Sequence, residues 1–199
     1  MPLLVLAGGA SRRMGRDKAA LAWRGEPLLS RVIARLSPVA DGVWVSTRPG
    51  QELPPGPYRR VDDHRPGEGP LAGLAAGLAA IGGSGQVAVA ACDYPFADPA
   101  LFPALRSAAP AAFAVVPVLD GRSHPLMALW RADAADACDR ALDRGARRVQ
   151  HVLDEIGGVE VPAAQLGLED PERALLNVND REALALALRL DSSAEDPAL

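Results

Sequence analysis

Glycines and basic residues gather directly after the first apolar run of this 199-residue chain. The run PLLVLA ends in the glycine pair Gly8 and Gly9. The loop LAGGASRRMGRDK, which starts at Leu6, then carries the basic residues Arg12, Arg13, Arg16 and Lys18. Glycines let backbone amides approach an anion closely, and arginine and lysine bind phosphate oxygens. The loop therefore predicts a polyphosphate site, with Arg13 and Lys18 as its cations.

Two common phosphate-binding signatures do not describe this loop. A Walker loop requires Ser or Thr after its lysine, whereas Lys18 is followed by Ala19. The dinucleotide signature GxGxxG is absent from GGASRRMG. A glycine-rich turn with solvated arginines is the remaining alternative, but such a cluster directly after a buried strand serves no packing purpose. We therefore expect a nucleotide loop of another kind.

A carboxylate, Asp93, follows the apolar run VAVAA of residues 87–91 in the stretch CDYPF. The strand would hold this aspartate on the same rim as the glycine-rich loop. Mg²⁺ prefers one or two carboxylates together with phosphate oxygens. We interpret Asp93 as a magnesium ligand, in preference to a turn aspartate before Pro95. The pair Asp62 and Asp63 is a weaker signal, because it also fits a solvated turn.

Composition excludes several other classes of protein. The net charge of −4 argues against a broad nucleic-acid surface. Cys92 and Cys138 form no CxxC pair, which disfavours disulfide and zinc frameworks. No apolar run reaches about 20 residues and no secretory signal is present, so we expect a cytoplasmic protein that does not enter a membrane. A GxSxG elbow is absent, and metal-ligand spacing is absent from His64, His124 and His151.

Alternating strands and helices must position these residues. We predict strands over residues 2–7, 42–47, 58–63, 87–91, 112–118 and 123–130, and a short strand-like run over 175–180. We predict helices over 28–36 and 70–81, after Asp98, and over 132–144, 147–156 and 181–190. This order favours a three-layer α/β/α Rossmann-like fold with a mainly parallel sheet. We expect a single domain over residues 1–190 and a frayed tail over 191–199.

Several stretches together resemble the nucleotidyltransferases with an LAGGxSxRMGxxK loop, and in particular the molybdenum cofactor guanylyltransferase family. Besides the loop, they are RGEPL, GPLAGLAAGL, CDYPF, HPLMALW and LLNVND, which span nearly the whole chain. The resemblance implies a nucleotidyltransferase fold and the transfer of GMP from GTP to the terminal phosphate of molybdopterin, with release of pyrophosphate. It implies GTP and molybdopterin as substrates, Mg²⁺ as cofactor, and contacts with other molybdenum-cofactor proteins or acceptor apoenzymes.

The resemblance also implies the residues of the site. Arg13, Lys18 and Asp93 would carry catalysis, and Asp93 would hold the metal. Asn177 and Asn179 would face the pterin. The nucleotide would be bound by Leu6, Ala7, Gly8, Gly9, Lys18, Asp63, Gly69, Pro70, Leu71, Gly73 and Asp93.

The sequence departs from the family pattern at two places, and a third place can be aligned with the family in two ways. Asp62 is the alternative to its neighbour Asp63 as the nucleotide-contacting aspartate. Ser46 and Thr47 stand where an asparagine is common in the family, and Tyr94 replaces a methionine after the CD pair. The difference at Ser46 and Thr47 removes an expected nucleotide contact, whereas the difference at Tyr94 leaves the carboxylate of Asp93 in place.

Alternative functions share much of this pattern. A cytidylyltransferase for the same pterin, or a nucleotidyltransferase for a sugar phosphate or phospholactate, would also need Lys18 and Asp93. The forms LAGG, GPLAG and NVN favour guanine and pterin. A non-catalytic adaptor that binds GTP and molybdopterin has no need to neutralise a leaving pyrophosphate, so Lys18 and Asp93 argue for an enzyme. Arg144, Arg147 and Arg148 are better explained as a solvated helix face than as pterin contacts.

Overall fold

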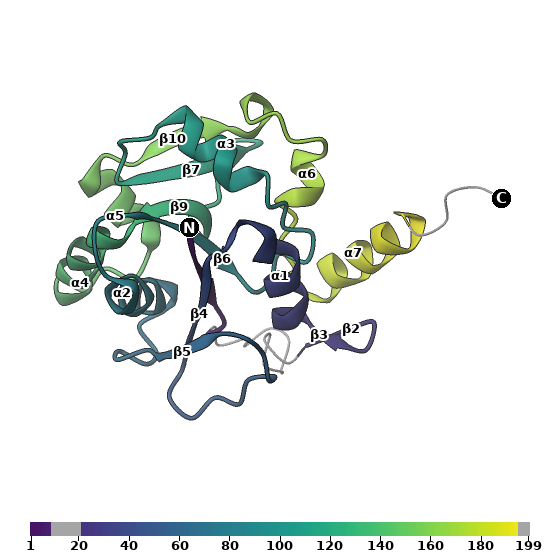
Figure 1. Ribbon diagram of the computed structural model, residues 1–199, viewed down its shortest axis with the longest axis horizontal. Coiled ribbons are helices and arrows are strands. Elements are labelled where there is room, and N and C mark those ends of the chain that lie inside the picture. The colour runs from purple at the N-terminus through teal and green to yellow at the C-terminus, as the bar shows by residue number, and fades with distance from the viewer. Residues whose placement is uncertain (9–20, 195–199) are drawn as a thin grey trace.

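A mixed sheet forms the centre of the protein in a computed structural model that describes residues 1–8 and 21–194 (Figure 1). Its strand order is β10-β7-β9-β6-β1-β4-β5, with β8 beside β7. The pairs β1–β4, β1–β6, β4–β5 and β7–β10 are parallel, whereas β9 is antiparallel to β6 and β7. The strands are β1 (Pro2–Leu6), β4 (Gly42–Thr47), β5 (Arg59–Asp62), β6 (Gln86–Ala91), β7 (Ala114–Leu119), β8 (Arg122–Ser123), β9 (Met127–Arg131) and β10 (Val159–Pro162).

Helices cover both faces of this sheet, as the three-layer prediction requires. Leu3 and Val5 of β1 pack on the side of α1 (Leu28–Leu36) and α3 (Leu101–Ala108). Leu4 and Leu6 pack on the opposite side, beneath α2 (Pro70–Ile81), α4 (Ala135–Asp143) and α5 (Val149–Ile156). Successive side chains of a strand point to opposite faces, so one apolar run supplies both cores. The mainly parallel α/β architecture predicted from the sequence is confirmed.

Small residues let α2 lie close to the sheet. A Cβ atom added at Gly77 would lie 2.4 Å from the methyl carbons of Leu4, so a side chain at this position would push the helix away from β1. The predicted helix over 70–81 agrees with α2, which begins with Gly69 as N-cap and Pro70 in the first turn. The helix thus brings its N-terminal residues to the carboxyl end of the parallel strands.

The C-terminal helix α7 (Arg181–Ala194) packs on a separate small core with the hairpin β2 (Ala22–Trp23) and β3 (Glu26–Pro27). On α7, Asp191 is only 6% exposed. Its carboxylate accepts hydrogen bonds from Trp23 Nε1 at 2.9 Å and from Arg31 Nη2 at 2.7 Å, and lies 3.4 Å from Arg24 Nε. We call these four residues the Asp191 cluster. The final helix was expected to end at residue 190, yet it continues to Ala194 and carries this buried carboxylate.

Some local predictions need correction. Residues 175–180 form no strand, because the backbone N–H of Val178 donates to the carbonyl of Asp93 at 2.8 Å without a ladder on either side. The helix after Asp98 begins only at Leu101, since Asp98 first caps a turn by accepting from the N–H of Ala100 at 2.8 Å. Strands β10, β2 and β3 were not predicted. The short helices are η1 (Ser37–Val39), η2 (Ala132–Ala134), η3 (Ala163–Gln165) and α6 (Pro171–Ala174).

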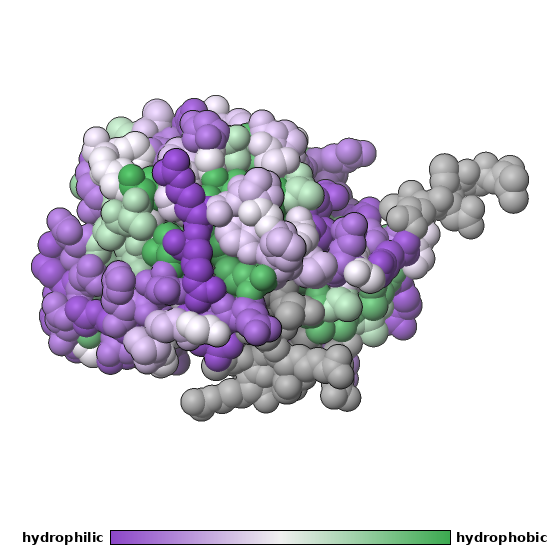
Figure 2. Space-filling model, turned by 60° about the horizontal axis from the view of Figure 1, so that its bottom comes forward, coloured by the Kyte–Doolittle hydropathy of each residue, from purple (hydrophilic) through white to green (hydrophobic). Residues whose placement is uncertain are grey.

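The surface is mainly hydrophilic on the face shown in Figure 2, where hydrophobic residues show in the middle of the face and on the α7 side. Leu186 and Leu190 of α7 are among the exposed large hydrophobic side chains, at 43% and 36%. Over residues 1–8 and 21–194, no helix has the length and apolar character needed to cross a bilayer.

Candidate functional site

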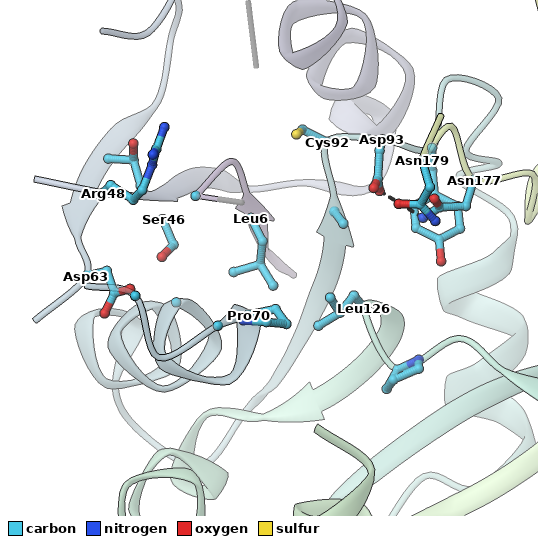
Figure 3. A pocket seen from close by; sticks show the side chains of 18 of the residues that line it. Leu6, Ser46, Arg48, Asp63, Pro70, Cys92, Asp93, Leu126, Asn177 and Asn179 are labelled. Carbon is cyan, nitrogen blue, oxygen red and sulfur yellow. Dashed lines mark hydrogen bonds between the residues drawn. The ribbon is translucent and has the colours of Figure 1, made fainter. Parts of the chain in front are cut away.

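A cavity of about 650 Å³ opens at the carboxyl end of β1, β4 and β6 (Figure 3). Ligands of open α/β sheets bind at this edge, because the loops that follow parallel strands converge there. Leu6 and Leu126 lie near its middle. We call one side the α2 end, lined by Ser46, Arg48, Asp63, Gly69 and Gly73. We call the other side the β8 end, lined by Asp93, Tyr94, Arg122, Asn177 and Asn179.

The two neighbouring aspartates after β5 have different surroundings. Asp63 is 5% exposed and lines the α2 end of the cavity. Its N–H donates to the carbonyl of Thr47 at 2.8 Å, and its Oδ1 accepts from the N–H of Arg65 at 2.8 Å. Asp62 is exposed instead, and pairs with Arg60 at 2.8 Å. The continuation of the β4–β5 pairing therefore directs the carboxylate of Asp63, and not that of Asp62, toward the cavity.

Glycines shape the floor of the α2 end. Gly69 has φ +89°, a conformation that side chains disfavour, where the chain turns into α2. A Cβ atom at Gly73 would lie 3.0 Å from the hydroxyl oxygen of Ser46 on β4. Pro70 lines the cavity between them. Leu71 and Ala7, also predicted for the nucleotide, are fully buried and lie behind the cavity wall.

A glutamine ties together the strand ends beneath this region. Gln51 Oε1 accepts from the hydroxyl of Thr47 at 2.7 Å, and its Nε2 donates to the carbonyl of Ala7 at 3.1 Å. Arg60 Nη1 donates to the backbone carbonyl of Gln51 at 2.6 Å. The proline-rich segment 49–57 thus carries one buried side chain that joins β1 to β4. Nothing in the local sequence PGQELPPGP marks that glutamine as different from a solvated one.

At the β8 end, a hydrogen bond joins two residues that are distant in the sequence. The amide Nδ2 of Asn177 donates to Asp93 Oδ1 at 2.9 Å, as the dashed line in Figure 3 marks. Asp93 is 7% exposed, and its backbone carbonyl holds the N–H of Val178. The buried Oδ1 of Asn177 accepts no hydrogen bond from the described part of the chain. Two oxygen-bearing side chains therefore meet where β6 ends, and Asn179 lines the cavity beside them.

Two uncharged aromatic side chains lie directly behind these oxygens. The hydroxyl of Tyr94 is 3.1 Å from His124 Nδ1, and both residues are buried. Burial lowers the pKa of His124 to about 4, and the positive charge of Arg122 acts in the same direction. Burial, together with the charge of Asp93, raises the pKa of Tyr94. At neutral pH an uncharged phenol and an uncharged imidazole therefore share this hydrogen bond.

The loop between β5 and α2 is held against the helical layer by charge pairs. Arg65 contacts Asp143 of α4 at 2.6 Å, and Arg147 contacts Glu68 at 3.2 Å. Arg147 also donates to the carbonyl of Ala146 at 2.8 Å. These pairs are about half exposed, so each contributes little stability, but together they restrain the loop that carries Asp63. Arg147 is therefore engaged outside the cavity.

Most of the predicted site residues that the structure describes line one cavity. They are Leu6, Gly8, Asp63, Gly69, Pro70, Gly73, Asp93, Asn177 and Asn179. Gly9, Arg13 and Lys18 lie outside the described residues. Among residues 1–8 and 21–194, no group of three or more His, Cys, Asp or Glu side chains could hold a metal ion. Sequence analysis did not single out Arg48 or Arg122 as cavity residues. Arg48 directly follows the strand predicted over 42–47, and Arg122 directly follows the turn residues Asp120 and Gly121.

This mainly parallel sheet, with a polar cavity at the carboxyl ends of its strands, has the architecture of the nucleotide-binding α/β proteins. Residues 3–157 match the MobA-like NTP transferase domain, and the chain belongs to this family. A relative from Mycobacterium avium, named "Probable molybdenum cofactor guanylyltransferase", is 41% identical over 92% of this chain and 94% of its own length. A Mycobacterium tuberculosis relative of the same name is 36% identical over 91% of this chain and 90% of its own.

Solved structures agree with the fold. Molybdopterin-guanine dinucleotide biosynthesis protein A from Archaeoglobus fulgidus is 26% identical, with a TM-score of 0.82 over 97% of this chain and 100% of that one. The 2-C-methyl-D-erythritol 4-phosphate cytidylyltransferase from Thermus thermophilus is 22% identical, with a TM-score of 0.72 over 96% of this chain and 98% of that one. At 22% identity, the second similarity concerns the fold alone.

Proposed function

We propose that this protein transfers GMP from GTP to the terminal phosphate of molybdopterin and releases pyrophosphate. The observation that carries the proposal is the 41% identity, over 92% of the chain, to a relative named for molybdenum cofactor guanylyltransfer. The cavity supports it, because its two ends offer room for two substrates that must meet. The α2 end would bind the nucleotide and the β8 end the acceptor.

The reaction requires positioning more than acid–base chemistry. An oxygen of the acceptor phosphate attacks the α-phosphorus of GTP and forms a new P–O–P bond. The bond from the α-phosphorus to the oxygen that bridges to the β-phosphorus breaks, and pyrophosphate leaves with that electron pair. The acceptor phosphate is already anionic, so no general base has to remove a proton. The protein must align the two groups and neutralise their negative charge.

At the α2 end, the buried Asp63 carboxylate would accept hydrogen bonds from the nucleoside. Gly69 and Gly73 leave space for the base to lie close to the α2 backbone. Leu6 and Pro70 would contact its apolar faces. Gly8 would begin the backbone cradle for the triphosphate, which Gly9, Arg13 and Lys18 would complete.

A divalent cation fits the oxygen atoms at the β8 end. Asp93 presents a carboxylate that Asn177 orients, and the amide oxygen of Asn177 has no hydrogen-bond partner in the described chain. Mg²⁺ prefers such hard oxygen ligands and takes its remaining ligands from phosphates and water. When bound, it would withdraw charge from the α-phosphate and the leaving pyrophosphate.

The test is pyrophosphate release with Mg²⁺ and molybdopterin, run in parallel with GTP, CTP, ATP and UTP, and with identification of the product by mass. We expect release with GTP only, and only when molybdopterin is present. Release with CTP alone would assign a cytidylyltransferase. Tight GTP binding without any release would overturn the proposal in favour of an adaptor.

A further inference from the structure

Arg122 is a charged residue of the β8 end for which the proposed function assigns no role. A two-residue turn, Asp120 and Gly121, joins β7 to β8 with φ +50° and φ +73°. Positive φ at both positions is the pattern of a tight hairpin turn whose twist matches that of the strands. Leu119 pairs with Arg122 across this turn, and Arg122 lines the cavity. The position of its backbone is therefore set by a rigid hairpin.

The charge of Arg122 is not matched within the described chain. The neighbouring hydroxyl of Ser123 donates to Glu160, whereas Arg122 makes no ion pair with any residue in 1–8 or 21–194. Its charge does reach inward, since it acts on both Tyr94 and His124. Those two side chains are buried and joined to each other, so they offer no opposite charge.

The surroundings of Arg122 fit an anionic group attached to a flat ring. Pro125 and Leu126, which follow β8 closely in the chain, line the cavity and provide an apolar surface. Asp93 carries a negative charge at the end of β6, which would repel a phosphate that lacked a cation beside it. A guanidinium group can bind two phosphate oxygens at once with its planar set of donors. This part of the cavity thus combines an apolar wall, the carboxylate of Asp93 and a guanidinium that forms no ion pair within the described residues.

We infer that Arg122 binds the phosphate of the acceptor substrate and so positions it beside Asp93. The inference rests on the proposed function, in which the acceptor is a phosphomonoester. It assigns acceptor affinity to the β7–β8 hairpin, which is separate from the α2 end of the cavity. The nucleotide should therefore bind normally when Arg122 is removed.

The test compares Arg122→Ala and Arg122→Lys with wild type and with Arg140→Ala. Arg140 is an exposed arginine of α4 outside the cavity, so its removal controls for the change in net charge. Losing a charged hydrogen bond to phosphate should raise the KM for molybdopterin about 10- to 100-fold in Arg122→Ala. The KM of Arg122→Lys for molybdopterin should lie between those of wild type and Arg122→Ala. The KM of both Arg122 variants for GTP, and the KM and kcat of Arg140→Ala, should change by less than about twofold.

Calorimetric titration with molybdopterin, without nucleotide, distinguishes failure of the role inferred for Arg122 from failure of the proposed function. If wild type turns over and Arg122→Ala keeps both its acceptor KM and its molybdopterin affinity, the role of Arg122 is overturned and the proposed function stands. If wild type neither binds nor modifies molybdopterin, the proposed function fails and the inference fails with it. Unchanged GTP affinity and circular dichroism of Arg122→Ala would show that the variant is folded.

Discussion

The two ends of the cavity are built in different ways. At the α2 end, residues directly after β4 and β5 and at the start of α2 come together because neighbouring parallel strands end at one edge. At the β8 end, Asp93 is joined to Asn177, 84 positions further along the chain, by one side-chain hydrogen bond. The first arrangement follows from sheet topology, and the second depends on a few long-range contacts. A substitution at the β8 end should therefore leave the α2 end in place.

Asp93 of the β8 end would hold the metal at the reacting phosphates, so its replacement should have the largest effect. Asp93→Asn keeps the size of the side chain and the backbone bond to Val178 but removes the charge that would hold the metal. We expect a loss of about two orders of magnitude in kcat, as for the removal of one transition-state contact. Pyrophosphate release at saturating GTP and molybdopterin measures it. Wild-type turnover in a folded variant would exclude a metal-binding role for Asp93.

Asp63 should affect the nucleotide end alone. Asp63→Asn should weaken GTP binding by about tenfold, because a buried charged acceptor is lost, and leave molybdopterin binding unchanged. Asp62→Asn is the matched control, since that carboxylate is exposed and pairs with Arg60. Calorimetric titration with GTP measures both. Equal effects of the two substitutions would show that the burial of Asp63 does not mark the nucleotide contact.

The buried imidazole at the β8 end should make stability depend on pH. The pKa of His124 is about 4 in the folded protein and about 6.5 in an unfolded chain. Between these values the unfolded chain binds a proton that the folded one does not, so this residue lowers the free energy of unfolding as the pH falls from 6.5 toward 4. The slope is about 1.4 kcal/mol per pH unit at most.

Urea unfolding of wild type and His124→Gln at pH 7.0 and 5.5 measures this contribution. Glutamine does not titrate, so the loss of stability between the two pH values should be smaller in the variant. Equal losses in both proteins would show that His124 already accepts a proton in the folded state.

The narrow gap between α2 and β4 should give the smallest effect. Gly73→Ala places a methyl group 3.0 Å from the Ser46 hydroxyl and should cost about 1 kcal/mol of stability. Ser46→Ala in the same chain removes that oxygen and should restore most of the loss. A thermal unfolding series of the two single variants and the double variant measures the coupling. Additive effects would show that the two side chains do not compete for this gap.

Much of the fold could be predicted from apolar runs and their boundaries. The runs over 42–47 and 70–81 agree with β4 and α2 because each is bounded by glycine, proline or a polar residue. Strand β10, with the sequence VEVP, was missed because it buries a single side chain, Val161, and so carries no continuous apolar signal. Residues 175–180 show the converse case. They carry an apolar run that predicted a strand, but they form no hydrogen-bonded ladder.

Asp63 and Asp93, which sequence analysis identified, lie just after strands and line the cavity. Arg122 and Gln51, which it did not single out, depend on tertiary structure. Arg122 reaches the cavity because the β7–β8 turn folds back along the sheet, and Gln51 is buried because the ends of β1 and β4 close around it. Single-sequence patterns report local periodicity, so they cannot show which exposed-looking polar residue a distant element will cover.

The Asp191 cluster has a consequence for the order of assembly. The carboxylate of Asp191 bonds to Trp23 and Arg31 over separations of 168 and 160 residues, among the longest in the chain. Contacts of such range form late, and during synthesis they must wait until α7 has left the ribosome. The β2–β3 hairpin is therefore made long before the partner that fixes it, which lies 168 positions after Trp23.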